Sequence, residues 1–155
     1  MLPALKSVLC FSDVSKTAGA TASGVIDTYD TNGNIKYSFL CLAYKEATVD
    51  VVSNKPTVLK LTEGETTVLT DATAIVDFTG GTATSTSVGF VIATGNTSVT
   101  TITQFNVDLR GRKRYIFLTA VPATTQIVGA FGVLSRGSES PATATKAGIK
   151  QLVES

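Results

Sequence analysis

Histidine and tryptophan are absent from this chain of 155 residues. Without histidine, the commonest general base and the commonest metal ligand are missing, and neither a Ser–His–Asp nor a Cys–His arrangement can form. Carboxylates remain, but their spacing implies no paired catalytic site; the candidates are Asp27, Asp30, Asp50, Asp77 and Asp108. We therefore expect no enzymatic activity, no bound metal and no cofactor.

Cysteine and charge are both scarce. Cys10 and Cys41 are the only cysteines, so there is neither a disulfide framework nor a CxxC pair for zinc, and buried free thiols are expected rather than a bridge. Charged residues make up 16% of the chain and the net charge is +1, so no overall field attracts nucleic acid or an anionic membrane.

Long apolar runs are missing too. No stretch approaches 18 uninterrupted apolar residues, which argues against a transmembrane helix. The N-terminal residues 1–13 have Pro3 early, Lys6 in the middle and no basic leader, unlike a signal peptide. We expect a soluble, non-secreted protein that is made in a cytoplasm and does not contact a membrane.

What the chain does contain is typical of β-structure. Roughly one residue in six is threonine, and valine is common; both fit a pleated strand better than a helix. Strand-like segments recur every 8–12 residues with turn signals between them, which indicates a sandwich or barrel. The expected strands are 35–44, 47–53, 56–64, 65–70, 72–79, 87–94, 99–109, 114–121 and 126–136.

These segments predict an all-β fold: a single, jelly-roll-like β-sandwich of eight or nine strands over residues 32–136. Residues 1–31 are expected to form an irregular N-terminal arm, and residues 137–155 a C-terminal tail whose last part could be a short helix. Both ends are either mobile tails or arms that become ordered on a neighbouring subunit. Within DTYDTNGN (27–34), Asn32-Gly33 predicts a hairpin turn, and the spacing does not fit a calcium loop.

A short basic run interrupts this weakly charged sequence. It contains three of the four arginines, and its members are Arg110, Arg112, Lys113 and Arg114. Gly111 at its centre suits a tight reversal between two strands. Three interpretations are open: a protein contact through forked guanidinium groups, a hairpin tip paired internally with Asp108, and a nucleic-acid site. The last lacks a basic stripe with interleaved aromatics, since only Tyr115 lies beside the run.

Two of the expected strands, 114–121 and 126–136, are apolar on both faces. Such a strand must be covered on both sides, whereas a small sandwich covers one face of each sheet. The excess surface is covered either by the N-terminal segment or by an identical subunit. Candidate contact residues are Phe117, Val121, Phe131 and Val133, in addition to Asp108, Tyr115 and the basic run.

The region 105–141 resembles a family of small virion proteins of tailed bacteriophages. In that family a V-D-L-x-G-R-x-R-Y-[ILV] segment leads into a strand, and a later strand ends in LxR before a tail rich in Ser, Ala and Pro. Residues 47–95 resemble the family loosely, and residues 1–30 carry nothing diagnostic. The matching positions are Val107, Asp108, Leu109, Gly111, Arg112, Arg114, Tyr115, Ile116, Leu134 and Arg136.

The resemblance implies a capsid decoration, or cement, protein: a structural β-sandwich, frequently trimeric, that binds the outer shell of the virion and stabilises it. Its partners would be further copies of itself and the major capsid protein, with no nucleic acid and no membrane. It would be made in the cytoplasm of a bacterial host and located on the capsid surface. Such a role needs no catalytic residues, and many weak copies on a lattice gain from avidity.

Besides a nucleic-acid-binding protein that uses the basic run, two other functions compete with this interpretation. One is another virion role, such as the base of a head fibre or a tail component. The other is a carbohydrate-binding or adhesin module, although the absence of tryptophan and an aromatic content of 7% give little surface for stacking on sugars.

Overall fold

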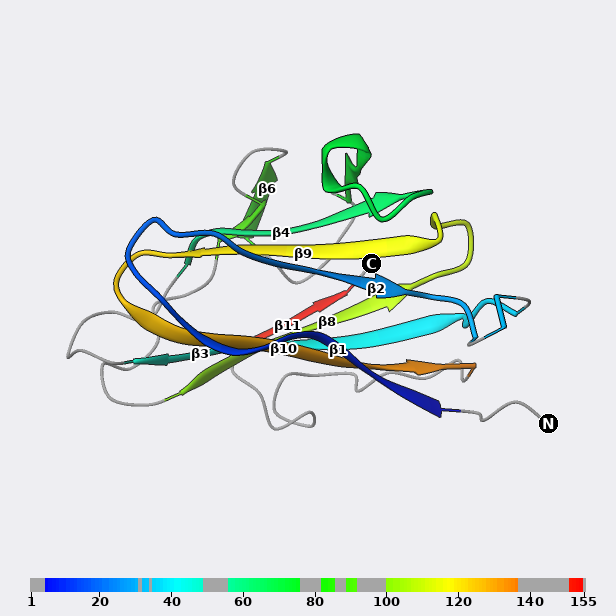
Figure 1. Ribbon diagram of the computed structural model, residues 1–155, viewed down its shortest axis with the longest axis horizontal. Coiled ribbons are helices and arrows are strands. Elements are labelled where there is room, and N and C mark those ends of the chain that lie inside the picture. The colour runs from blue at the N-terminus through cyan, green and yellow to red at the C-terminus, as the bar shows by residue number, and fades with distance from the viewer. Residues whose placement is uncertain are drawn as a thin grey trace.

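The structure is a computed structural model that describes residues 5–30, 32–33, 35–48, 56–75, 82–85, 89–91, 100–136 and 151–154. It is an all-β protein with two sheets in two layers (Figure 1). Helical structure among the described residues is one 3₁₀ turn, η1 (Leu69–Asp71). The all-β prediction is therefore confirmed.

Sheet A is the lower layer in Figure 1, and its strands follow the spatial order β1-β10-β3-β8-β11. All its pairs are antiparallel except β8 with β11, which is parallel. Its strands are β1 (Leu5–Lys16), β3 (Phe39–Thr48), β8 (Thr101–Asp108), β10 (Gln126–Ser135) and β11 (Gln151–Glu154).

Sheet B is the upper layer, in the order β2-β9-β4-β7-β6, with β5 paired to the end of β4. Along the chain, the longer strands β1, β2, β3, β4, β8, β9 and β10 alternate between the two sheets, whereas β5, β6 and β7 follow β4 within sheet B. Its strands are β2 (Ala22–Asp27), β4 (Pro56–Gly64), β5 (Thr73–Ala74), β6 (Thr82–Ser85), β7 (Gly89–Val91) and β9 (Tyr115–Pro122).

The core between the layers is built from alternate residues of each strand. In β3, for example, Leu40, Leu42 and Tyr44 are buried, whereas Cys41 and Ala43 are partly exposed. This is the two-residue period of a strand with one face on the core. Other large buried core residues include Ile26, Leu59, Leu61, Phe105, Ile116, Leu118 and Leu134.

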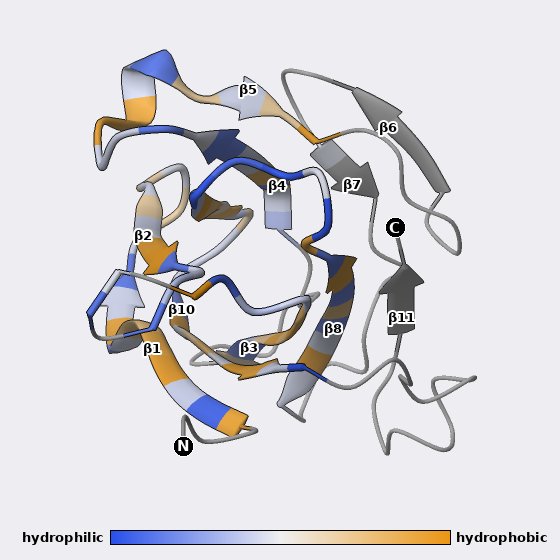
Figure 2. Ribbon diagram, turned by 90° about the vertical axis from the view of Figure 1, so that its right-hand side faces the viewer, coloured by the Kyte–Doolittle hydropathy of each residue, from blue (hydrophilic) through white to orange (hydrophobic). Residues whose placement is uncertain are grey.

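One side of the sandwich is closed where the edge strands β1 and β2 meet (Figure 2). Contact is close at Gly24 of β2, where an added Cβ would lie 2.1 Å from the carbonyl oxygen of Cys10 in β1. Only glycine permits this approach of the two backbones, so Gly24 sets how tightly the layers close.

The N-terminal residues form part of the sandwich, which corrects the prediction of an irregular arm over 1–31. β1 pairs with β10, and β2 pairs with β9. The register of β1 shifts twice, between Leu9 and Phe11 and between Phe11 and Val14. These irregularities break the alternation of apolar and polar residues after Leu9, so only residues 5–9 keep the period of a strand.

Three other segments differ from the prediction. β3 runs through Lys45 and Glu46, where a break was expected, because Glu46 faces the interior instead of a turn. Residues 65–70 form turns and the start of η1 rather than a strand. At the C-terminus, residues 151–154 form a strand rather than a helix, because they add to the edge of sheet A beside β8. Residues 137–150 lie outside the described residues.

Candidate functional site

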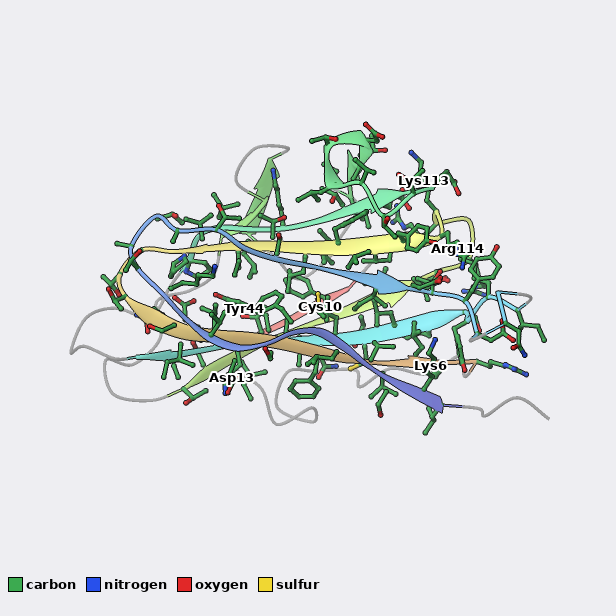
Figure 3. All side chains as sticks on the ribbon, in the orientation of Figure 1. Lys6, Cys10, Asp13, Tyr44, Lys113 and Arg114 are labelled. Carbon is green, nitrogen blue, oxygen red and sulfur yellow. The ribbon has the colours of Figure 1, made fainter. Side chains whose placement is uncertain are left out.

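The basic run forms the turn between β8 and β9 at one end of the layers, where Figure 3 labels Lys113 and Arg114. Gly111 has a φ of 81° and is exposed, in the left-handed region that favours glycine. The N–H of Arg112 donates to the carbonyl of Leu109 at 3.1 Å. The expected tight reversal is therefore present.

Arg114 anchors the turn to sheet B. Its guanidinium binds the carboxylate of Asp27 through two hydrogen bonds, Nε to Oδ1 at 3.0 Å and Nη2 to Oδ2 at 2.7 Å. It also stacks over the rings of Tyr29 and Tyr115, at 5.0 and 5.1 Å from their centroids. Burial acts to raise the pKa of Asp27, but the hydrogen bonds from Arg114 and from the N–H of Tyr29 hold it below its usual value. The planar fork of arginine makes this arrangement specific.

Arg112 and Lys113 are joined to β4 and β5. The Arg112 guanidinium lies 3.6 Å from the carboxylate of Glu63, and the N–H of Lys113 donates to the same carboxylate at 2.9 Å. The ammonium of Lys113 reaches the hydroxyl of Thr73 at 2.8 Å, and that of Lys36 binds the carbonyl of Arg112. Partial burial lowers the pKa of Lys36, although Glu63 acts in the opposite direction.

Arg110 differs from its three neighbours because its side chain is 76% exposed. Its guanidinium donates hydrogen bonds to the carboxylate of Asp108, from Nε to Oδ1 at 2.9 Å and from Nη2 to Oδ2 at 2.5 Å. The hydrogen bond from Arg110 lowers the pKa of Asp108. A surface pair of this kind adds little stability. Beside it lies a hollow of about 340 Å³ lined by Asp108, Arg110, Gly111 and Arg112.

All four basic side chains of the run thus have partners within the chain. Three of them link the turn to β2, β4 and β5, which matches the interpretation of a hairpin tip with internal pairing. Arg110 is left as the guanidinium that reaches into solvent. A protein contact through the turn stays a prediction, and Arg110 is the residue most available for it.

The four apolar contact candidates fall on two surfaces. Phe117 and Val121 belong to β9 in sheet B, whereas Phe131 and Val133 belong to β10 in sheet A. Phe117 is only 3% exposed and lines a hollow of about 220 Å³ together with Val25 and Leu69. Val121 is partly buried. One contact surface cannot contain all four residues.

The two doubly apolar strands are covered differently. In β9, every residue from 116 to 120 is buried, so both of its faces are covered within the chain. In β10, Ile127 and Phe131 remain exposed on the outer face of sheet A, and Phe131 is 54% exposed. The apolar face is the surface formed by Leu5, Leu9, Ile127, Phe131 and Val133.

Sequence reasoning missed Leu5 and Leu9 of this apolar face. They are the most exposed large apolar residues of the described chain, at 62% and 66%. Leu9 is the register partner of Phe131, and Ser7, two residues before it, is the partner of Val133. The spacing of Leu5, Ser7 and Leu9 is a strand period that could have signalled this face, but it was assigned to an arm.

Glu46 was also not identified from the sequence. It is 1% exposed in the interior and accepts a hydrogen bond from the hydroxyl of Tyr44 at 3.2 Å; Figure 3 shows Tyr44 between the layers. Burial raises the pKa of Glu46 to about 7, although the bond from Tyr44 acts to lower it. Such a group costs stability when it is charged.

The two cysteines are free, as expected. Burial raises the pKa of the Cys10 thiol to about 12, although a backbone hydrogen bond to Leu118 acts to lower it, and burial also raises the pKa of Cys41. Neither thiol is activated. Across the described part of the chain, no three side chains of the metal-binding types His, Cys, Asp or Glu converge as metal ligands would. The described segments also contain no helix with the length and apolar character needed to cross a bilayer.

The reversal predicted at Asn32-Gly33 is present. Gly33 has a φ of 71°, and its N–H donates to the carbonyl of Asp30 at 3.0 Å. Beyond it, Tyr29 and Lys36 form an antiparallel bridge.

No protein-family model matches this chain, and no curated protein matches it either. Among solved structures, the coat protein dimer of Tobacco streak virus is similar with a TM-score of 0.33 and 10% sequence identity, over 93% of this chain and 95% of that chain. A likeness at this level identifies no family.

Proposed function

We propose that the protein is a non-enzymatic structural component of a virion, and specifically a decoration protein of a phage capsid. In this role it associates with itself and binds the outer shell formed by the major capsid protein. The observation that carries the proposal is the exposed apolar face of sheet A, on a sandwich whose basic turn is paired with groups of the same chain. Three of the four cations of the basic turn brace the fold, and the outer face of sheet A leaves exposed apolar surface for binding.

The strand order supports a jelly-roll form of the sandwich. β1, β10, β3 and β8 follow one another in sheet A, and β2, β9, β4 and β7 do so in sheet B. Alternation of consecutive strands between two sheets is the order expected when a long hairpin is wrapped into two Greek keys. A rigid frame of this kind needs no ligand to hold its shape.

Shell binding and self-association would use two different surfaces. The turn at residues 108–114 presents Arg110 and the hollow beside it, which suits a carboxylate on the shell because a guanidinium offers a fork of donors. The apolar face of sheet A suits self-association. Repetition over the shell lattice turns a modest single contact into strong overall binding.

Particles that lack the protein provide the test. Shells prepared without it are mixed with purified protein, co-sedimented, and then heated with and without bound protein. We expect saturable binding and a raised temperature of shell rupture, with Arg110→Ala weakening the binding. Antibody labelling of whole virions that marks the tail instead of the capsid would overturn the decoration role, and absence of the chain from virions would overturn any virion role.

A further inference from the structure

The outer face of sheet A carries more exposed apolar surface than its own chain covers. Leu9 and Phe131 are register partners on β1 and β10, so their Cβ atoms are about 5 Å apart. Leu5 is the register partner of Ser135 and lies diagonally across from Val133, whose own partner is Ser7, a separation of about 7–8 Å that large side chains can span. These side chains therefore form one continuous patch and not scattered single residues.

This surface does not result from a poorly filled core. On the inner side of the same strands, Val128, Ala130 and Leu134 are fully or almost fully buried between the layers. Placing Phe131 and Ile127 outward leaves both faces of β10 apolar. A strand that is apolar on both faces is normally covered on both.

The patch approaches the apolar area that one partner contributes to a standard interface. A large apolar side chain presents roughly 150–250 Å² when free. With exposures of 62%, 66% and 54%, Leu5, Leu9 and Phe131 together expose roughly 300–400 Å². One partner in a standard interface contributes about 800 Å², a little over half of it apolar, or about 450 Å². Ile127, which is 38% exposed, lies on the same face of β10 but beyond Gly129, where the Asp13–Lys45 ion pair crosses the strand.

The charges beside the patch are of both signs. Asp13 of β1 and Lys45 of β3 form an ion pair across β10, where Gly129 has no side chain to obstruct it. Figure 3 shows Asp13 on the outer side of sheet A. A surface with both signs is complementary to its own two-fold image, because Asp13 of one copy can then face Lys45 of the other, whereas a surface of one sign repels itself.

We infer that the apolar face of sheet A is the contact surface between two copies of this chain. The second copy packs its own sheet A against it, with Leu9 and Phe131 at the centre and the Asp13–Lys45 pairs at the rim. Such a contact completes the cover that β10 lacks. The inference deepens the proposed function and rests on it for its purpose, since self-association is what a lattice-binding protein uses.

The test is the solution mass of Phe131→Lys and Leu9→Lys beside the wild type, by light scattering on a sizing column. We expect the wild type at twice the 16.1 kDa chain mass and both variants at the monomer mass at the same concentration. Val68→Lys is the matched control, because Val68 is 48% exposed in the segment before η1; its mass should equal that of the wild type.

Phe131→Ser is a milder substitution at the same position, for use if Phe131→Lys does not fold. Circular dichroism shows whether each variant is folded. A wild type that is monomeric, or lysine variants that keep the wild-type mass, would overturn the inference. So would a monomeric wild type whose binding to shells is lost in Phe131→Lys, because the face would then dock the shell protein. Loss of the oligomer in the variants together with no shell binding by the wild type would leave the inference standing and overturn the decoration role.

Discussion

The carboxyl group of Glu46 lies in the interior of the sandwich with a hydrogen bond to Oε2 from Tyr44, while no donor among the described residues reaches Oε1. Arg114 is the opposite case, because its positive charge is paired with a carboxylate through two hydrogen bonds and stacks on two aromatic rings. Individual side chains in this protein therefore differ sharply in whether ionisation supports the fold or opposes it.

Glu46→Gln should remove a pH dependence of stability. The folded pKa of about 7 is above the ordinary value of 4.5, so between these values the folded state holds a proton that the unfolded state has lost. The free energy of unfolding of the wild type should fall as the pH rises through this window, by up to about 3 kcal/mol. The chain has no histidine, whose titration would overlap.

Urea unfolding at pH 5 and pH 8.5 measures the effect. We expect Glu46→Gln to be the more stable protein at pH 8.5 and to show little change between the two values. Glu65→Gln, which alters an exposed carboxylate, should keep the wild-type slope. An unchanged slope in Glu46→Gln would show that Glu46 does not titrate in this range.

Arg114→Lys should lower Tm although it keeps the positive charge. A lysine cannot make both hydrogen bonds to Asp27 or lie flat on Tyr29 and Tyr115. Arg110→Lys is the matched control, because its pair with Asp108 lies in solvent and should leave Tm unchanged. Equal Tm values for the two variants would mean that the Arg114 anchor does not brace the turn.

Elements of this fold depend on positions where strands from different sheets approach closely. β1 pairs with β10 in sheet A, and it also contacts β2 of sheet B, which closes one side of the sandwich. β9 and β10 are joined by a short connection, yet one is buried on both faces and the other is open on its outer face. The same apolar character therefore leads to core in one strand and to contact surface in the next.

Gly24→Ala should destabilise the protein by separating β1 from β2. The new methyl group would meet the backbone of Cys10 at 2.1 Å, and a backbone cannot move aside as a flexible side chain does, so a cost of about 1–3 kcal/mol is expected. Denaturant unfolding compares it with Ser23→Ala, an exposed neighbour that should change little. Wild-type stability in Gly24→Ala would contradict the close contact.

At the scale of the whole molecule, the sandwich presents a basic turn and an exposed apolar surface. The basic turn is at one end of the layers, with its three arginines paired to carboxylates of the same chain and the ammonium of Lys113 bound to the hydroxyl of Thr73. The open apolar surface is on the outer side of sheet A at β1 and β10. The net charge of +1 adds no field over the remainder, so the molecule is suited to short-range contacts rather than to long-range attraction.

The protein should not be retained on heparin or DNA columns at physiological ionic strength. A nucleic-acid site needs free cations, and three of the four in the turn are braced against Asp27, Glu63 and Thr73. The measurement is elution as a function of salt concentration, with Arg110→Ala as the comparison. Strong retention that falls steeply with salt and is lost in Arg110→Ala would contradict the internal role of the turn.

The sequence alone determined the strand content, because β-branched residues and local alternation act over a few positions. Residues 56–64 form a strand with the expected bounds, and 101–108, 115–122 and 126–135 lie within one or two residues of expectation. Gly111 marked the reversal between two of them. The tertiary structure decided which groups meet. Asp27 and Arg114 are 87 positions apart, and no local pattern predicts their pairing.

The tertiary structure also decided which of the two apolar strands keeps an exposed face, and it decided that Glu46 is buried. Local pattern shows that a strand is apolar on both faces, but cover depends on which distant segment packs above it. β9 received such cover and the outer face of β10 did not. Periodicity is a property of neighbours in the chain, whereas burial is a property of neighbours in space, and in a sandwich these neighbours come from opposite ends of the sequence.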